Sequence, residues 1–213
     1  MTLILDPKGG RLCDSDGRVF DPAGRSWKQA SVPSQTDGRE VSLGEAVSWL
    51  QRDSGTPCRV PVGVIGARVP PEEYLVMAED FGKRLAELGL AVLCGGRQGI
   101  MEATCRGVAA GGGLSIGILP DGDPAAANPY VTVPIATGLG IARNAIVARA
   151  ALCLIAIGGG LGTISEVALG LQFEIPVFTL IDGPDVLGVK RCDSIDETVE
   201  GVARVVLNLD PCA

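Results

Sequence analysis

The sequence predicts an α/β fold, a doubly wound parallel sheet that carries a small N-terminal extension of β-hairpins and one helix. From about residue 58, apolar segments of strand length alternate with amphipathic segments of helical length. Continuous apolar strands of this kind are typical of a parallel sheet covered on both faces. Residues 1–57 differ, because turn-forming Asp, Gly, Pro and Ser split their short apolar pieces. We therefore divide the chain into an extension at 1–57 and a main domain at 58–213.

The extension is predicted to hold one or two hairpins and a short helix. In "LILDPKGGRLCDSDGRVFDPAGRSW", the turn formers "PKGG" and "SDG" separate apolar pieces. The helix is "SLGEAVSWL", where Ser42 and Glu45 have the spacing of a capping box. "RDSGTP" reads as a linker, and we expect Trp27 and Trp49 to pack the extension onto the main domain.

The main domain is predicted to be Rossmann-like, with strands and helices in alternation. Apolar runs predict strands at 60–66, 90–96, 114–120, 152–159 and 176–181, with a strand or extended segment at 130–137. Helical spacing predicts helices at 70–89, 99–113, 138–151 and 163–173, and a last helix within 193–209. In such a sheet, ligands bind beyond the carboxyl ends of the strands.

The charge balance and the cysteines restrict the partners of the chain. The net charge is −7 and no run of Lys or Arg occurs, which argues against binding to nucleic acid or to an anionic membrane. The seven cysteines, Cys212 among them, are scattered without a CxxC pair, as is typical of a reducing cytoplasm. No apolar run is long enough for a bilayer, and the first residues are too short an apolar stretch for a signal peptide. We expect a cytoplasmic protein.

The sequence contains no histidine. This absence excludes Ser-His-Asp and Cys-His nucleophiles and every histidine-based metal site. We expect no metal site, so any chemistry must come from Arg, Asp, Glu, backbone amides or a bound cofactor.

Three glycine-rich turns follow predicted strands: "GVIGAR" at 63–68, "CGGRQGIM" at 94–101 and "IGGGLGT" at 157–163. If the sheet is parallel, all three lie at its carboxyl edge. Glycine lets a backbone approach a ligand closely, and a helix that starts there presents free N–H groups to an anion. Neither a P-loop nor a clean G-x-G-x-x-G occurs. Turn geometry alone explains the first turn equally well, but the other two together favour a phosphate site.

Glu166 has two interpretations. Thr163 and Glu166 have T-x-x-E spacing, which indicates a capping box at the start of a helix. Alternatively, Glu166 faces a ligand held by the glycines. Arg143 precedes the strand that leads to them, so both side chains can reach one edge of the sheet. A surface or structural salt bridge is the competing explanation for Arg143.

These motifs resemble those of a known family. "GGGLGTISE" resembles the PGGxGTxxE motif of the LOG ("lonely guy") family, and "GGRQGIMEATCRGV" is similar to that family's GGGxxGLMG segment. "YVTVPIATGLGIARNAIVARAA" resembles the TGLGxARN signature of a sub-branch of Rossmann-like nucleotide-binding proteins near the molybdenum-cofactor carrier proteins. The resemblance runs from about residue 59 to the C-terminus.

The resemblance implies a phosphoribohydrolase that cleaves the N-glycosidic bond of a nucleoside 5'-monophosphate such as AMP, giving free base and ribose 5-phosphate. It implies Arg143 and Glu166 as catalytic residues, no required cofactor, and a homodimer or homotetramer. The nucleotide- or phosphate-binding residues expected on this basis are Gly66, Gly95, Gly96, Gly99, Met101, Asn144, Gly159, Gly160, Gly162 and Thr163.

Two departures from the family pattern keep other functions open. Gly158 stands where the motif has Pro, and Asn144 stands where Lys commonly follows the catalytic Arg. One alternative is a carrier that binds the molybdenum cofactor (molybdopterin) without catalysis. The other is a regulatory nucleotide-binding module in which Glu166 only caps its helix.

Overall fold

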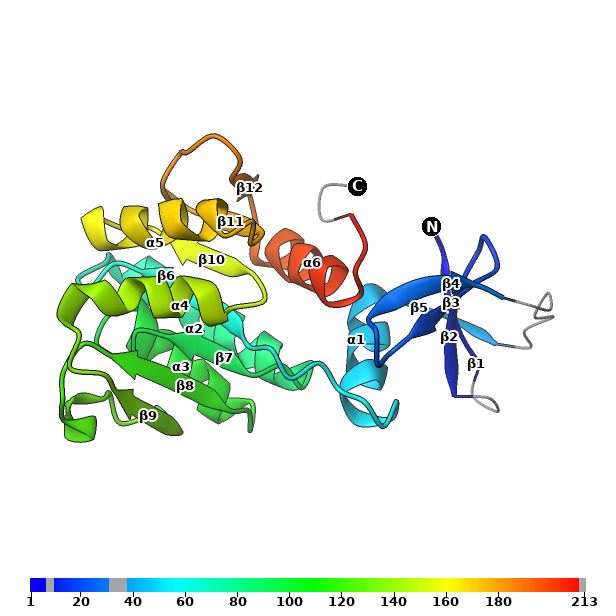
Figure 1. The fold of residues 1–213 in the computed structure, drawn as a ribbon, viewed down its shortest axis with the longest axis horizontal. Coiled ribbons are helices and arrows are strands. Elements are labelled where there is room, and N and C mark those ends of the chain that lie inside the picture. The colour runs from blue at the N-terminus through cyan, green and yellow to red at the C-terminus, as the bar shows by residue number, and fades with distance from the viewer. Residues whose placement is uncertain (7–9, 31–37, 211–213) are drawn as a thin grey trace.

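The computed structural model describes residues 1–6, 10–30 and 38–210. These residues form two sheets with helices α1 and α6 between them (Figure 1). The predicted "PKGG" turn falls largely on residues 7–9, and Cys212 falls in 211–213, so both lie outside the described residues.

The N-terminal sheet has five antiparallel strands in the order β4-β3-β2-β1-β5. Its strands are β1 (Leu3–Asp6), β2 (Arg11–Asp14), β3 (Arg18–Asp21), β4 (Ser26–Gln29) and β5 (Arg39–Val41). The prediction of one or two hairpins missed β5, because β5 pairs with β1 from more than thirty residues away. Helix α1 (Leu43–Arg52) follows, and its predicted capping box between Ser42 and Glu45 is confirmed.

The main sheet has seven strands, all parallel, in the order β12-β11-β10-β6-β7-β8-β9. Its strands are β6 (Val62–Gly66), β7 (Val92–Cys94), β8 (Ser115–Leu119), β9 (Val133–Ala136), β10 (Leu154–Ile157), β11 (Val177–Leu180) and β12 (Lys190–Cys192). The predicted doubly wound, Rossmann-like sheet is confirmed. The chain direction across the sheet reverses between β6 and β10, the switch point where such sheets bind ligands.

Helices cover both faces of this sheet. They are α2 (Glu72–Glu87), α3 (Ile100–Ala110), α4 (Asn144–Ala150), α5 (Leu161–Gln172) and α6 (Ile195–Val206), with short 3₁₀ turns η1 (Pro124–Ala126) and η2 (Gly140–Arg143). Strand β10 shows why both faces are apolar. Ile155 and Ile157 pack in the cluster that contains α2, α3 and α6, whereas Leu154 and Ala156 pack with α4 and α5.

Three local predictions need correction. The helix expected at 138–151 begins as the 3₁₀ turn η2 and becomes α-helical only at Asn144. The helix expected from Thr163 begins at Leu161, with Gly160 as its N-cap. The short edge strand β12 was not predicted, because its residues, KRC, contain no apolar run.

The extension is docked onto the C-terminal end of α6. Arg25 donates from Nε to the carbonyl of Val206 at 3.0 Å and from Nη2 to that of Val205 at 2.7 Å. Trp27 Nε1 donates to the carbonyl of Leu207 at 2.8 Å. These donors satisfy carbonyls that a helix end leaves unpaired. Because Trp49 also lies in the shared apolar cluster, the predicted packing role of both tryptophans is confirmed.

The boundary between extension and main domain at residues 57 and 58 stays a prediction. Among the helices of the described residues, none combines the length and the apolar character that crossing a membrane requires.

Candidate functional site

A cavity of about 510 Å³ lies beyond the carboxyl ends of β6, β7 and β10. We call it the site cavity. Its wall comes from the turns after these three strands and from the η2–α4 and α5 segments; the residues are Ile65, Gly66, Ala67, Arg68, Gly95, Met101, Pro120, Gly140, Ile141, Arg143, Asn144, Gly159, Gly160, Gly162, Thr163 and Glu166. The volume lies within the range of about 300–1,000 Å³ found for small-molecule sites. The switch point of the sheet therefore holds a space for a ligand of that size.

The start of α5 faces this cavity without a cap. Gly160 is its N-cap residue, and no side chain of the described residues caps the helix there. The first N–H groups of an α-helix have no partner within the helix, and together they carry a partial positive charge. Gly160 and Gly162 are exposed, and a Cβ on either would meet no atom within 4 Å. The arrangement fits an anion such as a phosphate.

Thr163 and Glu166 do not form the capping box that their spacing suggested. The helix begins three residues earlier than that box requires, so Thr163 lies in the first turn and Glu166 in the second. Thr163 is buried against Gly159, where a Cβ would lie 2.6 Å from Thr163 Cβ. Glu166 is thereby freed from capping and points to another partner.

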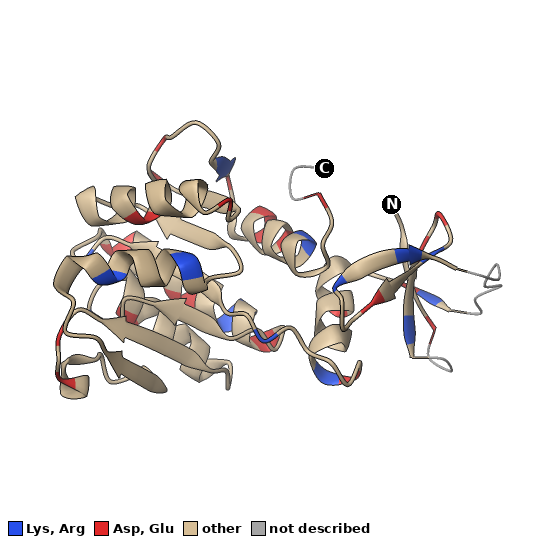
Figure 2. Cartoon of the chain, in the orientation of Figure 1, with Lys and Arg blue, Asp and Glu red and all other residues tan. Residues whose placement is uncertain are grey.

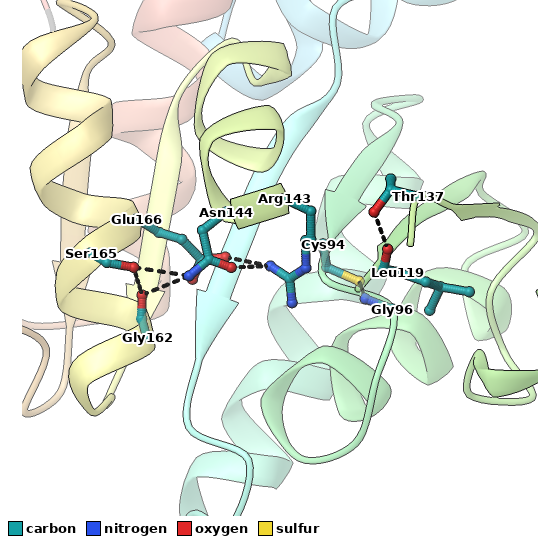
Figure 3. A network of polar contacts seen from close by, with 9 residues as sticks. All are labelled: Cys94, Gly96, Leu119, Thr137, Arg143, Asn144, Gly162, Ser165 and Glu166. Atoms are coloured by element: carbon teal, nitrogen blue, oxygen red, sulfur yellow. Dashed lines mark hydrogen bonds and ion pairs between the residues drawn. The ribbon is translucent and has the colours of Figure 1, made fainter. Parts of the chain in front are cut away.

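That partner is Arg143. Its Nη1 donates to Glu166 Oε1 at 2.9 Å, and the two side chains are only 10% and 8% exposed (Figure 3). The same Nη1 lies 2.6 Å from Oδ1 of Asn144. The ion pair is buried in the cavity wall and does not lie on the surface, so the alternative of a structural salt bridge for Arg143 fits this contact, and its catalytic role stays a prediction. Arg143 Nε is also buried and has no partner among the described residues.

Burial changes the acidity of Glu166. Desolvation raises its pKa from 4.5 to about 7, although the positive charge and hydrogen bond of Arg143 act in the opposite direction. The side chain therefore exchanges its proton near neutral pH. Groups perturbed in this way, and placed in a cleft, are typical of functional sites.

Asn144 connects the two segments that carry this pair. Its Nδ2 donates to Ser165 Oγ at 2.9 Å and approaches the carbonyl of Gly162 at 3.4 Å, while Ser165 Oγ donates to the same carbonyl at 2.7 Å (Figure 3). A Lys at this position would lack the acceptor oxygen that Arg143 uses. The departure from the family pattern at Asn144 thus has a structural role at the start of α5.

Gly95 and Gly66 are glycines for steric reasons. A Cβ on Gly95 would lie 2.4 Å from Arg143 Nη2 and 2.8 Å from Met101 Sδ. A Cβ on Gly66 would lie 2.5 Å from the carbonyl oxygen of Ile157. All three distances are too short for a real Cβ contact. These glycines let the guanidinium group and strand β10 approach the wall of the site cavity closely.

Gly96 and Gly99 do not line the site cavity. Gly96 has φ +71° and lies against β8, where a Cβ would be 2.7 Å from Leu119 Cδ2. Gly99 is the N-cap of α3 with φ +73°, and a Cβ there would be 2.4 Å from the carbonyl oxygen of Ala67. That carbonyl accepts the N–H of Ile100 at 3.1 Å. In the turn after β7, these two glycines therefore allow close packing. The first amide of α3 is already hydrogen-bonded to the Ala67 carbonyl.

Ten of the twelve residues expected at the site line the cavity, and their roles toward a ligand stay predictions. Six cavity residues were not among those expected: Ile65, Ala67, Arg68, Pro120, Gly140 and Ile141. Arg68 is the most informative of them. Within the part of the chain that the structure describes, it forms no ion pair, so its charge is available to a ligand. Its place directly after "GVIGA" was the signal that could have found it.

The described residues contain no group of three or more Cys, Asp or Glu side chains placed to hold a metal ion. Figure 2 shows Lys and Arg distributed over the main domain and the extension, without a block on one element. The positive charge at the site cavity comes from Arg68, Arg143 and the start of α5.

Comparisons with known proteins agree with this geometry. A molybdenum cofactor binding protein from Rippkaea orientalis has 35% sequence identity and a TM-score of 0.65, covering 70% of this chain and 98% of its own. The molybdenum cofactor carrier protein from Chlamydomonas reinhardtii has 34% identity and a TM-score of 0.62, covering 68% of this chain and 98% of its own. An uncharacterized protein from Archaeoglobus fulgidus is 37% identical over 138 residues, which are 65% of this chain and 91% of that protein.

The model of the SLOG cluster4 family matches residues 59–205, more than half of the chain. The match begins where the predicted main domain begins and includes every turn of the site cavity. It confirms the resemblance based on "GGGLGTISE" and "GLGIARN". The chain belongs to the SLOG cluster4 family.

Proposed function

We propose that this protein binds the molybdenum cofactor in the site cavity and carries it without chemical change. The observation that carries the proposal is the uncapped, glycine-flanked start of α5, which opens onto a cavity large enough for a phosphorylated pterin. The similarity to a binding protein and a carrier protein for this cofactor supports it.

The residues present fit such a ligand. The amides at the start of α5 would hold the phosphate, with Arg68 as a second positive group. Ile65, Met101, Pro120 and Ile141 supply apolar surface for the ring system. The cofactor brings its own sulfur ligands for molybdenum, so the protein needs no metal-binding side chains of its own.

Gly160→Asp tests the proposal. An Asp at an N-cap position accepts hydrogen bonds from the helix amides, so the variant keeps or stabilises α5 while its carboxylate occupies the anion site. We expect wild-type protein, incubated without oxygen with cofactor released from a molybdoenzyme, to elute from gel filtration with molybdenum and pterin. Gly160→Asp should elute with neither.

Gly122→Asp is the matched control, because Gly122 lies outside the site cavity and a Cβ there meets no atom within 4 Å. It should retain the cofactor. Failure of the wild-type protein to take up molybdenum and pterin would contradict the carrier function, and equal uptake by Gly160→Asp would place the ligand elsewhere.

A second candidate is the phosphoribohydrolase activity that the LOG resemblance implies. The observation that favours it is Glu166, a carboxylate in the cavity wall whose pKa is raised to about 7. Loss of a base from a ribose leaves positive charge on the sugar ring, which a carboxylate stabilises. Arg143 would hold Glu166 in position.

Incubation with AMP tests this activity through the release of adenine and ribose 5-phosphate. Glu166→Gln should abolish release, whereas Glu87→Gln, on the exposed face of α2, should not. Absence of free base from every nucleoside monophosphate tested would end this candidate and leave the carrier function.

We also propose that copies of the chain associate as a homodimer or homotetramer. Large apolar side chains are exposed on η2, α4 and α5, the adjacent segments that carry Arg143 and Glu166: Ile141, Ile146, Leu161 and Ile164. Light scattering that returned the mass of one chain, 21.9 kDa, at micromolar concentration would refute this.

A further inference from the structure

The glycine loop, Gly158–Gly160, begins in a way that the PGGxGTxxE motif does not allow. Gly158 has φ +55°, and its N–H donates to the carbonyl of Ile181 at 3.0 Å. Proline is fixed near φ −65° and has no N–H. The glycine loop of this chain therefore depends on a hydrogen bond to a neighbouring turn, which a proline at its first position cannot make.

That neighbouring turn follows β11 and has an uncommon backbone. Ile181 and Asp182 both lie in the left-handed region, with φ +40° and +46°. A β-branched residue rarely adopts this conformation, and it persists only where surrounding contacts determine it. Gly183 continues the turn, packed so closely on β11 that a Cβ would lie 2.7 Å from Thr179 Cβ.

Tyr74, near the start of α2, contacts both the loop and the turn. A Cβ on Gly158 would lie 3.0 Å from Cδ2 and Cε2 of the Tyr74 ring, so the ring packs directly on the glycine. The Tyr74 hydroxyl donates to the carboxylate of Asp182. Tyr74 is only 8% exposed. One side chain thus connects α2, the first residue of the glycine loop and the left-handed turn.

We propose that Tyr74 and Asp182 are positioning residues for the glycine loop, an inference that rests on the proposed anion-binding function. Neither side chain lines the site cavity. Their hydrogen bond holds the turn in the conformation that presents the Ile181 carbonyl to Gly158. The hydrogen bond from Gly158 to the Ile181 carbonyl then fixes the direction in which Gly159, Gly160 and the start of α5 face a ligand.

The Tyr74–Asp182 hydrogen bond, which lies outside the site cavity, is therefore expected to affect the affinity of the cavity for an anion. When the turn relaxes, the loop occupies binding-competent conformations for a smaller fraction of the time, and the apparent Kd rises by the inverse of that fraction. Loss of one hydrogen bond of ordinary net strength corresponds to roughly a fivefold to tenfold change in such an equilibrium.

Three variants separate the contacts. Tyr74→Phe keeps the ring on Gly158 and removes the hydroxyl. Asp182→Asn keeps an acceptor for that hydroxyl and tolerates the left-handed backbone. Asp182→Gly suits the backbone best but has no acceptor. Tyr130→Phe and Asp185→Asn are matched controls, because Tyr130 and Asp185 lie outside the cavity and the turn network.

The readouts are the exchange rate of the Gly158 amide with deuterium, measured by NMR, and calorimetric titration with inorganic phosphate. Thermal unfolding identifies any variant that fails to fold. We expect Tyr74→Phe and Asp182→Gly to accelerate exchange at Gly158 roughly fivefold to tenfold and to weaken phosphate binding by up to the same factor. Asp182→Asn and both controls should match the wild type in both measurements.

Wild-type exchange and affinity in Tyr74→Phe would overturn the proposal. So would wild-type values in Asp182→Gly, because the backbone conformation alone would then be enough. If the wild-type protein takes up neither cofactor nor phosphate, the proposed function fails, but the exchange rates at Gly158 still decide whether Tyr74 and Asp182 position the loop.

Discussion

Arg143 and Glu166, separated by 23 positions in the sequence, form a buried ion pair in which Nη1 donates to Oε1 at 2.9 Å. Arg143 lies where a 3₁₀ turn becomes α4, and Glu166 lies in the second turn of α5. The guanidinium group rests on Gly95 from the turn after β7. Three segments of the chain therefore meet at one charged pair in the wall of the site cavity.

The first prediction concerns the pH dependence of stability. Because burial raises the Glu166 pKa from 4.5 to about 7, the folded protein binds more protons than the unfolded chain between these pH values. The corresponding stabilisation is complete below pH 4.5 and is lost as the pH rises through 7. Its full size is about 3 kcal/mol. Glu166→Gln should lack it, so the free energy of unfolding of wild type minus variant should fall as the pH rises from 4.5 to 8. A difference constant with pH in urea titrations would contradict this.

The second prediction concerns Gly95. Gly95→Ala would place a methyl group 2.4 Å from Arg143 Nη2, so the guanidinium group must move away from the cavity wall. We expect a loss of stability of about 1–3 kcal/mol, as for other overpacked sites, together with weaker phosphate binding. Gly122→Ala, in open space, is the control for both measurements. Equal affinity of Gly95→Ala and wild type would show that the position of Arg143 does not matter for the anion.

The third prediction restores the family motif. Gly158→Pro introduces the residue found in PGGxGTxxE, but it removes the N–H that bonds to Ile181 and forces φ from +55° to the proline value. We expect lower stability and weaker phosphate binding, because the backbone of this loop is built for glycine. Thermal unfolding and calorimetry measure the two effects. A variant with wild-type stability and affinity would show that the loop can adopt the motif's geometry.

The fourth prediction concerns the docking of the extension. Trp27→Phe keeps an aromatic ring but removes the hydrogen bond to the carbonyl of Leu207. The expected loss of stability is about 1 kcal/mol, the usual net value of one hydrogen bond. Limited proteolysis should then cut between the extension and the main domain faster than in wild type. Arg191→Met, at a weak surface ion pair, is the control; a cutting rate for Trp27→Phe equal to that of the control would contradict the docking role.

The sequence by itself determined the parallel sheet, most of its strands and helices, and the three glycine turns at one edge. These features depend on residues close together in the chain, because apolar periodicity and turn formers act locally. The capping box of Ser42 and Glu45 is of this kind, and the structure contains it.

Only the tertiary structure decided what Glu166 does. The T-x-x-E spacing is equally compatible with a cap, but α5 begins at Leu161, and Glu166 accepts a hydrogen bond from Arg143. The separate uses of Gly95 and Gly96, and the link from Tyr74 to Gly158, were likewise invisible in the sequence. Each depends on atoms brought together from distant segments, and local patterns carry no information about such neighbours.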